Sequence, residues 1–571
     1  MTENPHTIVH RTDYTPPDYL VDTVGLRFEL GEETTTVTAR LAIRRRGDAP
    51  RPLVLDGHRI DLRSLRLDGV QLTPADYTVS AGQLTIPAVP AAFTLETVTE
   101  LRPQENTRLE GLYRSAGMFC TQCEAEGFRS ITYYPDRPDV LAVFTTTVVA
   151  DRTRYPVLLA NGNPVETGEL PDGRHFATWH DPFPKPSYLF ALVAGNLVCA
   201  QDSFITASGR EVSLRVYVEA ANRHKCAHAL RSLQHAMRWD EERFGREYDL
   251  DCYLIVAVDD FNMGAMENKG LNIFNSRYVL ATPETATDDD FHAIEEVVGH
   301  EYFHNWSGNR VTCRDWFQLS LKEGLTIFRD QEFSADMGSR GVKRIGDVRY
   351  LRTVQFAEDT GPLAHPVRPD SYMEINNFYT TTVYNKGAEV IRMLRTLLGP
   401  ERFRAAMDLY FSRFDGQAAT VDDFVAAMEE AGGRDLAQFR LWYGQAGTPQ
   451  VTASASFAPE TGSFTLTLRQ TTPPTPGQPQ KAPLHIPLLM GLLDHDGREL
   501  PVTLAAEPQP GPTTRLFELR QTEEVYRFTG LAAAPVPALL RGFCAPVRLD
   551  YPYGHDELVL LMAHEPDPFS R

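Results

Sequence analysis

The sequence predicts a multidomain α+β protein, and three observations support this prediction. Its 571 residues exceed the roughly 250–300 at which a single hydrophobic core stops growing. Polar and apolar residues alternate through about the first 196 positions and again after residue 448, as in half-buried β-strands. Between these regions, from residue 288 onward, the pattern becomes helical. The chain shows no internal repeat.

The first part of the chain, residues 1–196, is predicted to form an antiparallel β-sheet domain. The runs Val24–Leu30 and Thr36–Ile43 place apolar side chains at alternate positions, and turn residues separate such runs. The next region, residues 197–447, opens with strand-like segments and then becomes rich in helix. We therefore expect a mixed domain there, which carries most of the candidate functional residues.

The remainder of the chain returns to alternation. Residues 448–548, which include the alternating run Phe464–Leu468, predict a small β-sandwich. Within it, the proline-rich stretch 471–483 is interpreted as a long hairpin loop rather than a domain linker. Residues 549–571 are interpreted as the start of a further, helical domain.

One stretch of the mixed region, HEYFHNWSGNRVTCRDWFQLSLKE over residues 300–323, has the spacing of a metal site. His300 and His304 are four residues apart, so on a helix both imidazoles project from one face. Glu323 follows after a gap of eighteen residues, long enough to end one helix and begin another. Two histidines and one glutamate leave one tetrahedral position of a zinc ion open, as in catalytic sites, and Glu301 is placed to deprotonate water.

The residues around His300 predict the helices that this spacing needs. The segment 285–290, TATDDD, supplies a Thr/Asp N-cap and an acidic first turn. An apolar stripe at helical spacing follows: Phe291, Ile294, Val298 and Tyr302. For an arbitrary pair of histidines, two surface or core side chains would be the better interpretation. Glu301 and the helical setting of Glu323 favour the metal.

A second group of residues, Gly264–Asn268 with the sequence GAMEN, follows the apolar run Tyr253–Val258, which predicts a buried strand. A glycine at a strand edge lets a substrate backbone approach closely and pair by main-chain hydrogen bonds. Glu267 would then point its carboxylate into the groove. Taken in isolation, the sequence around Glu267 fits a solvated turn residue better.

Together these motifs resemble the zinc aminopeptidase N family of gluzincins, and most closely its bacterial aminopeptidase N branch. The resemblance rests on GAMEN, HExxH and a glutamate eighteen residues on, in the family's order. Three further segments support it: CTQCEAEGFR at 120–129, YTTTVYNKGAE at 379–389 and WYGQAG at 442–447. The similarity covers about residues 110–450 and implies that the mixed domain is thermolysin-like.

The resemblance also implies a role for each matching residue. One zinc ion per chain would be held by His300, His304 and Glu323, with Glu301 as the general base. Tyr384 would donate a hydrogen bond to the oxyanion of the tetrahedral intermediate. The substrate-binding residues would be Gln122, Glu124, Met263, Gly264, Ala265, Met266, Glu267 and Asn268.

Two of these side chains explain the expected substrate class. Glu267 and Glu124 would hold the free α-ammonium of a short peptide, with Gln122 lining the same pocket. An internal peptide nitrogen carries no charge to satisfy two carboxylates, so cleavage is expected at the N-terminus. Met263 would flank the pocket for the first side chain with a flexible thioether.

Two neighbours of Glu323 have weaker claims to a role. Asp330 lies seven residues later on the same helical face, and it either orients a ligand or forms a surface ion pair. Lys322 either tunes the charge of the pocket or is an ordinary solvated lysine, and the solvated side chain is the better prediction.

The cysteines predict a reducing compartment. Cys120 and Cys123 form a CxxC pair, but no second pair follows and nearby glutamates disfavour a thiolate, so we interpret both as structural. Seven scattered cysteines do not suit a disulfide scaffold. The N-terminal residues show no secretory signal and no apolar run is long enough to span a membrane, so a cytoplasmic location is expected.

The net charge of −20 argues against a nucleic-acid partner. The end of the chain departs from the family, whose bacterial members continue into a large helical domain that covers the active site. From this we expect reduced or less selective peptidase activity, and a fragment with weak or no activity is one alternative. A related epoxide hydrolase is the other, although the CTQCEAE and GAMEN segments argue against it.

Overall fold

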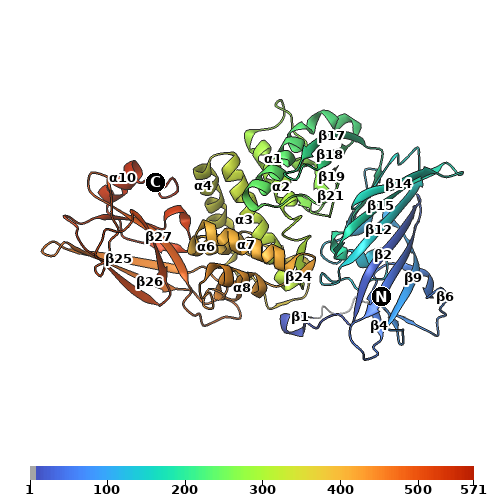
Figure 1. Cartoon of the computed structure of the whole chain (residues 1–571), viewed down its shortest axis with the longest axis horizontal. Coiled ribbons are helices and arrows are strands. Elements are labelled where there is room, and N and C mark those ends of the chain that lie inside the picture. The colour runs from blue at the N-terminus through green and yellow to red at the C-terminus, as the bar shows by residue number, and fades with distance from the viewer. Residues whose placement is uncertain (1–7, 81) are drawn as a thin grey trace. The chain divides into compact units, whose positions relative to one another are not determined.

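The computed structural model describes residues 8–80 and 82–571, and Figure 1 shows its elements. Residues 1–7, where the predicted first domain and the stretch tested for a secretory signal begin, lie outside the described residues. Contacts divide the chain into two compact units. The first comprises residues 1–12, 317–413 and 421–571, and the second comprises residues 13–316 and 414–420. The domain limits at 196, 447 and 548 stay predictions.

The second unit begins with an eight-stranded sheet that confirms the predicted β-rich start. Its spatial order is β14 (Asn163–Glu169), β15 (Arg174–Lys185), β12 (Ala142–Asp151), β2 (Tyr19–Leu30), β3 (Thr35–Arg45), β9 (Ala92–Leu101), β5 (Asp61–Leu67) and β6 (Val70–Gln71). Buried and solvent-facing residues alternate along β2 and β3, as the sequence predicts. All pairs are antiparallel except β2 with β12, which is parallel.

Two smaller sheets accompany the large one. The first, in spatial order, is β10 (Gly111–Ser115), β11 (Met118–Gln122), β16 (Leu192–Gly195) and β13 (Val157–Ala160). The second is β4 (Leu53–Asp56), β8 (Gln83–Ile86) and β7 (Thr78–Ser80). Strand β11 is buried along its whole length and ends at Gln122. Its packing therefore holds in place the start of the segment that contains Glu124.

The mixed part of the same unit carries most of the candidate site. Its five-stranded sheet has the order β17 (Val198–Ile205), β18 (Glu211–Val218), β19 (Cys252–Val258), β21 (Leu271–Asn275) and β20 (Ala265–Met266). Strand β19 is the predicted apolar strand and is almost fully buried. Helices α1 (Ala227–Phe244) and α2 (Asp288–Phe303) pack against each other. Gly245, with a φ of 63°, ends α1 in the left-handed conformation that favours glycine.

The first unit supplies the helix-rich part that the sequence predicts. Its helices are α3 (Leu319–Met337), α4 (Arg340–Tyr350), α5 (Phe356–Glu358), α6 (Gly387–Leu398), α7 (Pro400–Phe414), α8 (Val421–Gly432) and α9 (Leu441–Gly444). Two π-helical turns, η8 (Leu351–Gln355) and η10 (Thr382–Lys386), interrupt the α-helical geometry, and η10 runs directly into α6.

The predicted β-sandwich region forms two four-stranded sheets. The first has the order β30 (Glu523–Phe528), β26 (Ser463–Thr471), β25 (Gln450–Ala458) and β32 (Arg548–Asp550). In the second, β27 (Ile486–Leu493) pairs with β28 (Glu499–Leu500), β29 (Thr514–Leu519) and β31 (Val536–Leu539). The chain ends in α10 (His555–His564) and a short irregular segment.

The hairpin predicted for the proline-rich stretch 471–483 is wrong. Strand β26 before it pairs with β25 and β30, and strand β27 after it belongs to the other sheet. The stretch therefore crosses between sheets, and its prolines suit a connection that makes no ladder. Among the described residues, no helix combines the length and hydropathy that crossing a bilayer requires.

Candidate metal centre and substrate site

Helix α2 ends at the two histidines predicted to bind a metal. Its N-cap is Thr287, whose side chain accepts a hydrogen bond from the backbone of Asp290 while the Asp290 carboxylate accepts one from the Thr287 backbone. This capping box confirms the predicted helix start. Three residues of the predicted stripe are buried: Ile294, Val298 and Tyr302. His300 lies in the last turn, and His304 is the C-cap residue with helical backbone angles.

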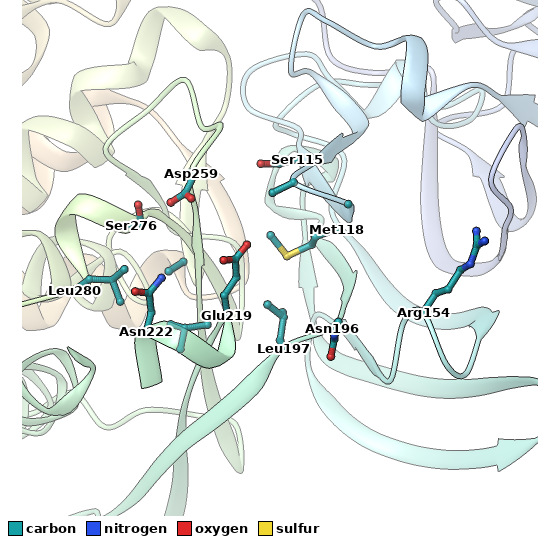
Figure 2. Close-up of a pocket in the computed structure, with 14 residues that line it drawn as sticks. Ser115, Met118, Arg154, Asn196, Leu197, Glu219, Asn222, Asp259, Ser276 and Leu280 are labelled. Carbon is teal, nitrogen blue, oxygen red and sulfur yellow. The ribbon is translucent and has the colours of Figure 1, made fainter. Parts of the chain in front are cut away.

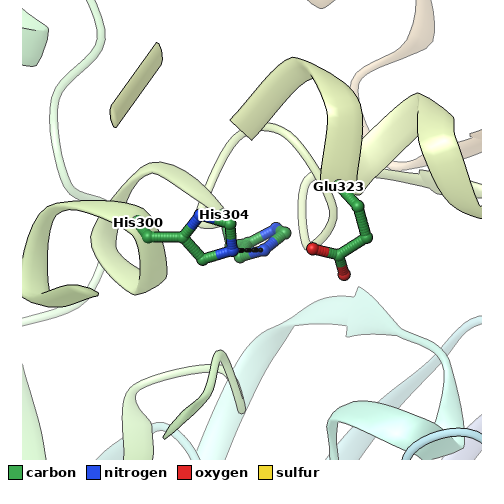
Figure 3. A group of neighbouring side chains, drawn as sticks. All are labelled: His300, His304 and Glu323. Atoms are coloured by element: carbon green, nitrogen blue, oxygen red, sulfur yellow. Dashed lines mark hydrogen bonds between the residues drawn. The ribbon is translucent and has the colours of Figure 1, made fainter. Parts of the chain in front are cut away.

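The imidazoles of His300 and His304 approach each other through their Nε2 atoms. Nε2 of His300 and Nε2 of His304 are 3.0 Å apart, as Figure 3 shows. The Nδ1 of His304 donates to the backbone oxygen of Ser307 at 2.8 Å, which leaves its Nε2 as the lone-pair nitrogen. Two zinc–nitrogen bonds of about 2.0–2.1 Å at a tetrahedral angle separate their nitrogens by roughly 3.3 Å. The pair therefore fits a shared zinc ion.

Glu323, the third predicted ligand, lies in the second turn of α3, as expected, and is buried. His300 and His304 belong to the second unit and Glu323 to the first, so the joint coordination of one metal by the three residues stays a prediction. Figure 3 draws the three side chains. An imidazole–imidazole–carboxylate donor set suits zinc.

The solvated side chain predicted for Lys322 is wrong, and of the two interpretations given for Asp330 the structure excludes the surface ion pair. Lys322 is 1% exposed, and its Nζ donates to the neighbouring Glu323 carboxylate. Asp330 is also 1% exposed, so it cannot form a surface pair. The burial of both residues has one physical cause. A lysine or aspartate is buried only with partners, and those partners come from other parts of the fold that local sequence does not reveal.

The GAMEN residues form the edge of the five-stranded sheet. Ala265 and Met266 constitute β20, which pairs antiparallel with β21 and is the last strand of the order. Across the described residues, no strand pairs with its other edge. Gly264 is exposed and Met263 is half-buried just before this strand. An extended peptide can therefore add to this edge by main-chain hydrogen bonds, which is the geometry that the sequence predicts.

The glutamates near this edge are buried rather than solvated. Glu267 is 3% exposed, so the solvated turn that its sequence favours in isolation is wrong. Oxygens of Glu267 and Glu124 lie within 4.8 Å of each other. Glu124 follows the buried strand β11, and Gln122 ends that strand. Two buried like charges at this separation favour a bound cation.

The amide of Gln122 adds a further acceptor to this group. Its Nε2 donates to the backbone oxygen of Glu124 at 3.2 Å and contacts the Met266 sulfur at 3.6 Å. Its Oε1, and both polar side-chain atoms of Asn268, are buried without a hydrogen-bond partner among the described residues. Buried polar atoms nearly always have partners, so these atoms are available to a polar ligand or to water.

Glu301 lies beside the histidines and close to Glu267. One oxygen from each glutamate and one nitrogen of His304 lie within 4.8 Å of one another. Tyr253, from β19, faces the same carboxylates. Burial, and then the charge of Glu301, raise the pKa of Tyr253 well above its usual value, although Asn272 donates to its hydroxyl at 2.5 Å and opposes this shift. Tyr253 therefore stays neutral beside Glu301.

Tyr384 lies in the π-helical turn η10, which is fixed at both ends. The backbone of Thr382 donates to the Glu358 carboxylate at 2.8 Å, and Lys386 donates to Asp359 at 2.7 Å. Lys386 also donates to the backbone oxygen of Gly447 at 3.0 Å, so two segments of the predicted family signature meet here. Turn η10 packs against α3, the helix that carries Glu323.

The CxxC cysteines have no sign of reactivity. Burial is the largest influence on both thiols and raises the pKa of Cys120 to about 12 and that of Cys123 well above its usual value. A thiol with such a pKa stays protonated and is a poor nucleophile or metal ligand. This agrees with the structural role predicted for them.

Sequence reasoning missed several residues that hold the site together. Ser307 accepts from His304, and Asn309 donates to the backbone oxygen of Glu267 at 2.9 Å. Lys269 donates to Asp249 and Asn305 within the same region. Asn305 and Asn309 lie inside the quoted 300–323 stretch, but no local pattern distinguishes them from solvated asparagines.

The second unit also has a pocket that is lined by none of the predicted site residues. It has a volume of about 230 Å³. Figure 2 shows Glu219, Asn222, Asp259 and Ser276 on one side of it and Ser115 and Met118 on the other. Two exposed carboxylates in a small hollow are explained by solvation, and we assign them no role.

Comparison with known proteins agrees with this geometry. Residues 31–189 match the Peptidase M1 N-terminal domain, residues 228–443 match the Peptidase family M1 domain, and residues 447–552 match a domain of unknown function with an Ig-like fold. An HExxH motif followed eighteen residues later by a glutamate is the pattern of the gluzincin class of metallopeptidases. The chain belongs to peptidase family M1.

Its relatives are known proteins of that family. The chain is 55% identical to aminopeptidase N of Escherichia coli over all of its own length and 65% of that protein. It is 54% identical to aminopeptidase N of Haemophilus influenzae, over 98% of this chain and 64% of the relative. The chain thus spans just under two thirds of these relatives.

A solved structure shares the fold. Aminopeptidase A of Legionella pneumophila, in complex with aspartic acid, superposes with a TM-score of 0.90 at 36% identity. The match covers 99% of this chain and 63% of that one. The α+β fold predicted from the sequence is therefore confirmed.

Proposed function

We propose that the chain carries the active site of a zinc-dependent aminopeptidase that releases N-terminal residues from short peptides. One observation carries the proposal: a pair of imidazole nitrogens 3.0 Å apart lies in the same unit as two buried carboxylates within 4.8 Å of each other. The first pair suits a metal and the second suits an ammonium group. The relatives named aminopeptidase support the same reaction.

His300, His304 and Glu323 would hold one zinc ion per chain. Zinc supplies a Lewis acid that polarises a carbonyl and lowers the pKa of water. Glu301 would act as the general base, taking a proton from the attacking water and passing it to the leaving amine. Tyr384 would donate its hydroxyl hydrogen to the oxyanion that develops on the scissile carbonyl.

Glu267 and Glu124 would hold the α-ammonium of the substrate, with Gln122 accepting a further hydrogen bond. The free edge of β20 would pair with the substrate backbone at Gly264 and Ala265. Because an acylated or internal nitrogen carries no charge, it would leave the two carboxylates uncompensated. This discrimination restricts cleavage to free N-termini. The side chain of the first residue would lie against Met263.

Hydrolysis of aminoacyl p-nitroanilides tests the proposal. We expect turnover that is lost with a chelator and restored by zinc, with N-acetylated analogues inert. Glu301→Ala should abolish turnover while leaving one zinc per chain, measured by atomic absorption. Turnover that survives Glu301→Ala would refute the assignment of the base. A protein that binds zinc but hydrolyses none of twenty aminoacyl derivatives would refute the activity.

We also propose that the protein works in a reducing compartment such as the cytoplasm. No disulfide joins any of the seven cysteines, all of which the structure describes. Fractionation of cells that express the full protein, with a cytoplasmic and a periplasmic marker enzyme, tests this location. Recovery with the periplasmic marker would contradict it.

A further inference from the structure

Asn309 connects two segments of the second unit: the one that contains Glu267 and the one that contains His304. Its side-chain Nδ2 donates to the backbone oxygen of Glu267 at 2.9 Å, and its backbone nitrogen donates to the backbone oxygen of His304 at 3.0 Å. The residue is 5% exposed. One asparagine therefore bonds directly to the residue proposed to hold the substrate ammonium and to a proposed metal ligand.

Lys269 makes a second connection between the same segments. It lies two residues after Glu267, and its Nζ donates to Oδ1 of Asn305 at 2.7 Å. Asn305 is the residue after His304. The same Nζ donates to Oδ2 of Asp249 at 2.6 Å, and Asp249 also accepts from Arg310 at 2.8 Å.

Both connections are buried, which makes them stiff. Lys269 is 2% exposed, so water cannot take the place of the Asp249 carboxylate as the partner of its charge. Hydrogen bonds to charged groups are the strong ones in proteins, and a shared partner such as Asp249 limits the positions that Lys269 and Arg310 can take. Asn161 adds a bond from outside the cluster, donating to the backbone oxygen of Lys269 at 2.9 Å.

The chemistry of an aminopeptidase needs such stiffness. In a substrate, the α-nitrogen and the scissile carbonyl belong to one residue, so their separation is fixed by covalent geometry. The carboxylate that holds the nitrogen must therefore keep a fixed distance from the groups that act on the carbonyl. A displacement of about 1 Å can cost on the order of a hundredfold in rate.

We propose that Asn309 and Lys269 are positioning residues that set the distance between Glu267 and His304. They thereby determine how strongly the site selects a free N-terminus. This inference rests on the proposed aminopeptidase function. The side-chain bond that Asn309 makes goes to Glu267, and its buried Oδ1 has no partner among the described residues. An asparagine kept only for stability would be expected to use its buried acceptor as well.

The test compares two inhibitors that differ by one amino group. Leucine hydroxamate presents both an α-ammonium and a metal-binding hydroxamate, whereas 4-methylpentanohydroxamate presents the same chain without the amine. The ratio of their inhibition constants measures the contribution of the ammonium site alone. We expect Asn309→Ala to lower that ratio about tenfold, while the Ki of the amine-free compound and the zinc content stay within about twofold.

Two further variants separate positioning from stability. Asn309→Asp keeps the volume but replaces the donor with an acceptor, so it should lower the ratio at least as much. Gln470→Ala is the matched control. Gln470 is also a buried amide that donates to a backbone oxygen, of Leu484 at 2.8 Å, but in the β-sandwich region. It should reduce the melting temperature and leave the ratio unchanged.

The contribution of Lys269 is tested by changing Asn305, its hydrogen-bond partner directly after His304. Asn305→Ala removes the bond from Lys269 and leaves the pair with Asp249 intact. It should also lower the inhibitor ratio, and it provides the answer if the Asn309 variants do not fold. An unchanged ratio in the variants that fold, or equal weakening of both hydroxamates, would overturn the inference. Failure of the proposed function appears separately, because the wild-type protein would then hydrolyse no aminoacyl p-nitroanilide and would not prefer the hydroxamate that carries the amine.

Discussion

Gly324 and Gly387 pack against each other without any intervening side chain. A Cβ placed on Gly324 would lie 2.9 Å from the carbonyl carbon of Gly387 and 2.7 Å from Oγ of Ser320. Helix α3 therefore approaches the turn η10 and helix α6 more closely than any larger residue allows. Ser320 strengthens this approach by donating to the backbone oxygen of Val383 at 2.8 Å. Glu323 and Tyr384 each lie next to residues of this contact.

Gly324→Ala should separate these elements. The added methyl group meets backbone at Gly387, which cannot move aside as a flexible side chain would, so we expect a loss of about 1–3 kcal/mol in the free energy of unfolding. Turnover should fall more than the stability explains, since Glu323 and Tyr384 are displaced. Gly346→Ala is the control, because a Cβ there meets no atom within 4 Å. Equal effects of the two substitutions, by urea titration, would contradict the explanation.

Glu124→Gln should weaken binding of substrates with a free amine. The substitution removes one of two negative charges around the ammonium, and a hydrogen bond to a charged group contributes about 1.5–3 kcal/mol. We expect KM for leucine p-nitroanilide to rise about tenfold or more, with a smaller change in kcat. Glu126→Gln, two residues away in an ion pair with Arg129 at 3.3 Å, is the matched control. A rise in KM for both variants would mean that the loop, and not the ammonium, is affected.

Tyr384→Phe should lower kcat by about a hundredfold to a thousandfold with little change in KM. The hydroxyl is proposed to act on charge that develops only in the transition state, so its loss should not affect ground-state binding. Tyr372→Phe removes a hydroxyl from another half-buried tyrosine of the same unit and should be neutral. Steady-state kinetics on one substrate measure kcat and KM separately, and so distinguish lost transition-state stabilisation from lost substrate binding. A large rise in KM for Tyr384→Phe would assign it to substrate binding instead.

The sequence predicts the metal-binding helix well because its signals are local. The capping box joins Thr287 to Asp290, three positions later, and successive members of the stripe Ile294, Val298 and Tyr302 are four positions apart. The alternation of β2 and β3 is local in the same sense. Such patterns follow from the geometry of a single element, so they need no knowledge of the tertiary fold.

What escaped prediction depends on residues far apart in the chain. Asn309 and Glu267 are separated by 42 positions, and nothing near either one indicates their hydrogen bond. The usual preference of lysine for solvent predicts an exposed Lys322, yet the fold buries it with Glu323. The stretch 471–483 joins two sheets, which its turn-forming composition does not distinguish from a hairpin. In each case tertiary packing overrides the local preference.

The final prediction concerns acid stability and a buried carboxylate in α3. Glu332 is 2% exposed and accepts from Arg392 at 2.8 Å and from Arg340 at 3.1 Å, with Arg395 at 3.6 Å. Burial by itself would raise the pKa of Glu332. The charges of Arg392, Arg395 and Arg340 outweigh it and lower the pKa to about 2, from an ordinary value of 4.5.

Because the pKa is lower in the folded protein than in the unfolded chain, Glu332 stabilises the fold above pH 4.5 and loses that contribution as the pH falls toward 2. The shift corresponds to about 3 kcal/mol at neutral pH. Glu332→Gln should cost about that much at pH 7, and its deficit against the wild type should shrink as the pH falls through this window. Glu523→Gln, in an exposed pair with Arg469, should cost less than about 1 kcal/mol at either pH. Urea titrations at pH 7 and pH 3 measure both, and a deficit for Glu332→Gln that is the same at the two pH values would show that lost packing, rather than charge, explains it.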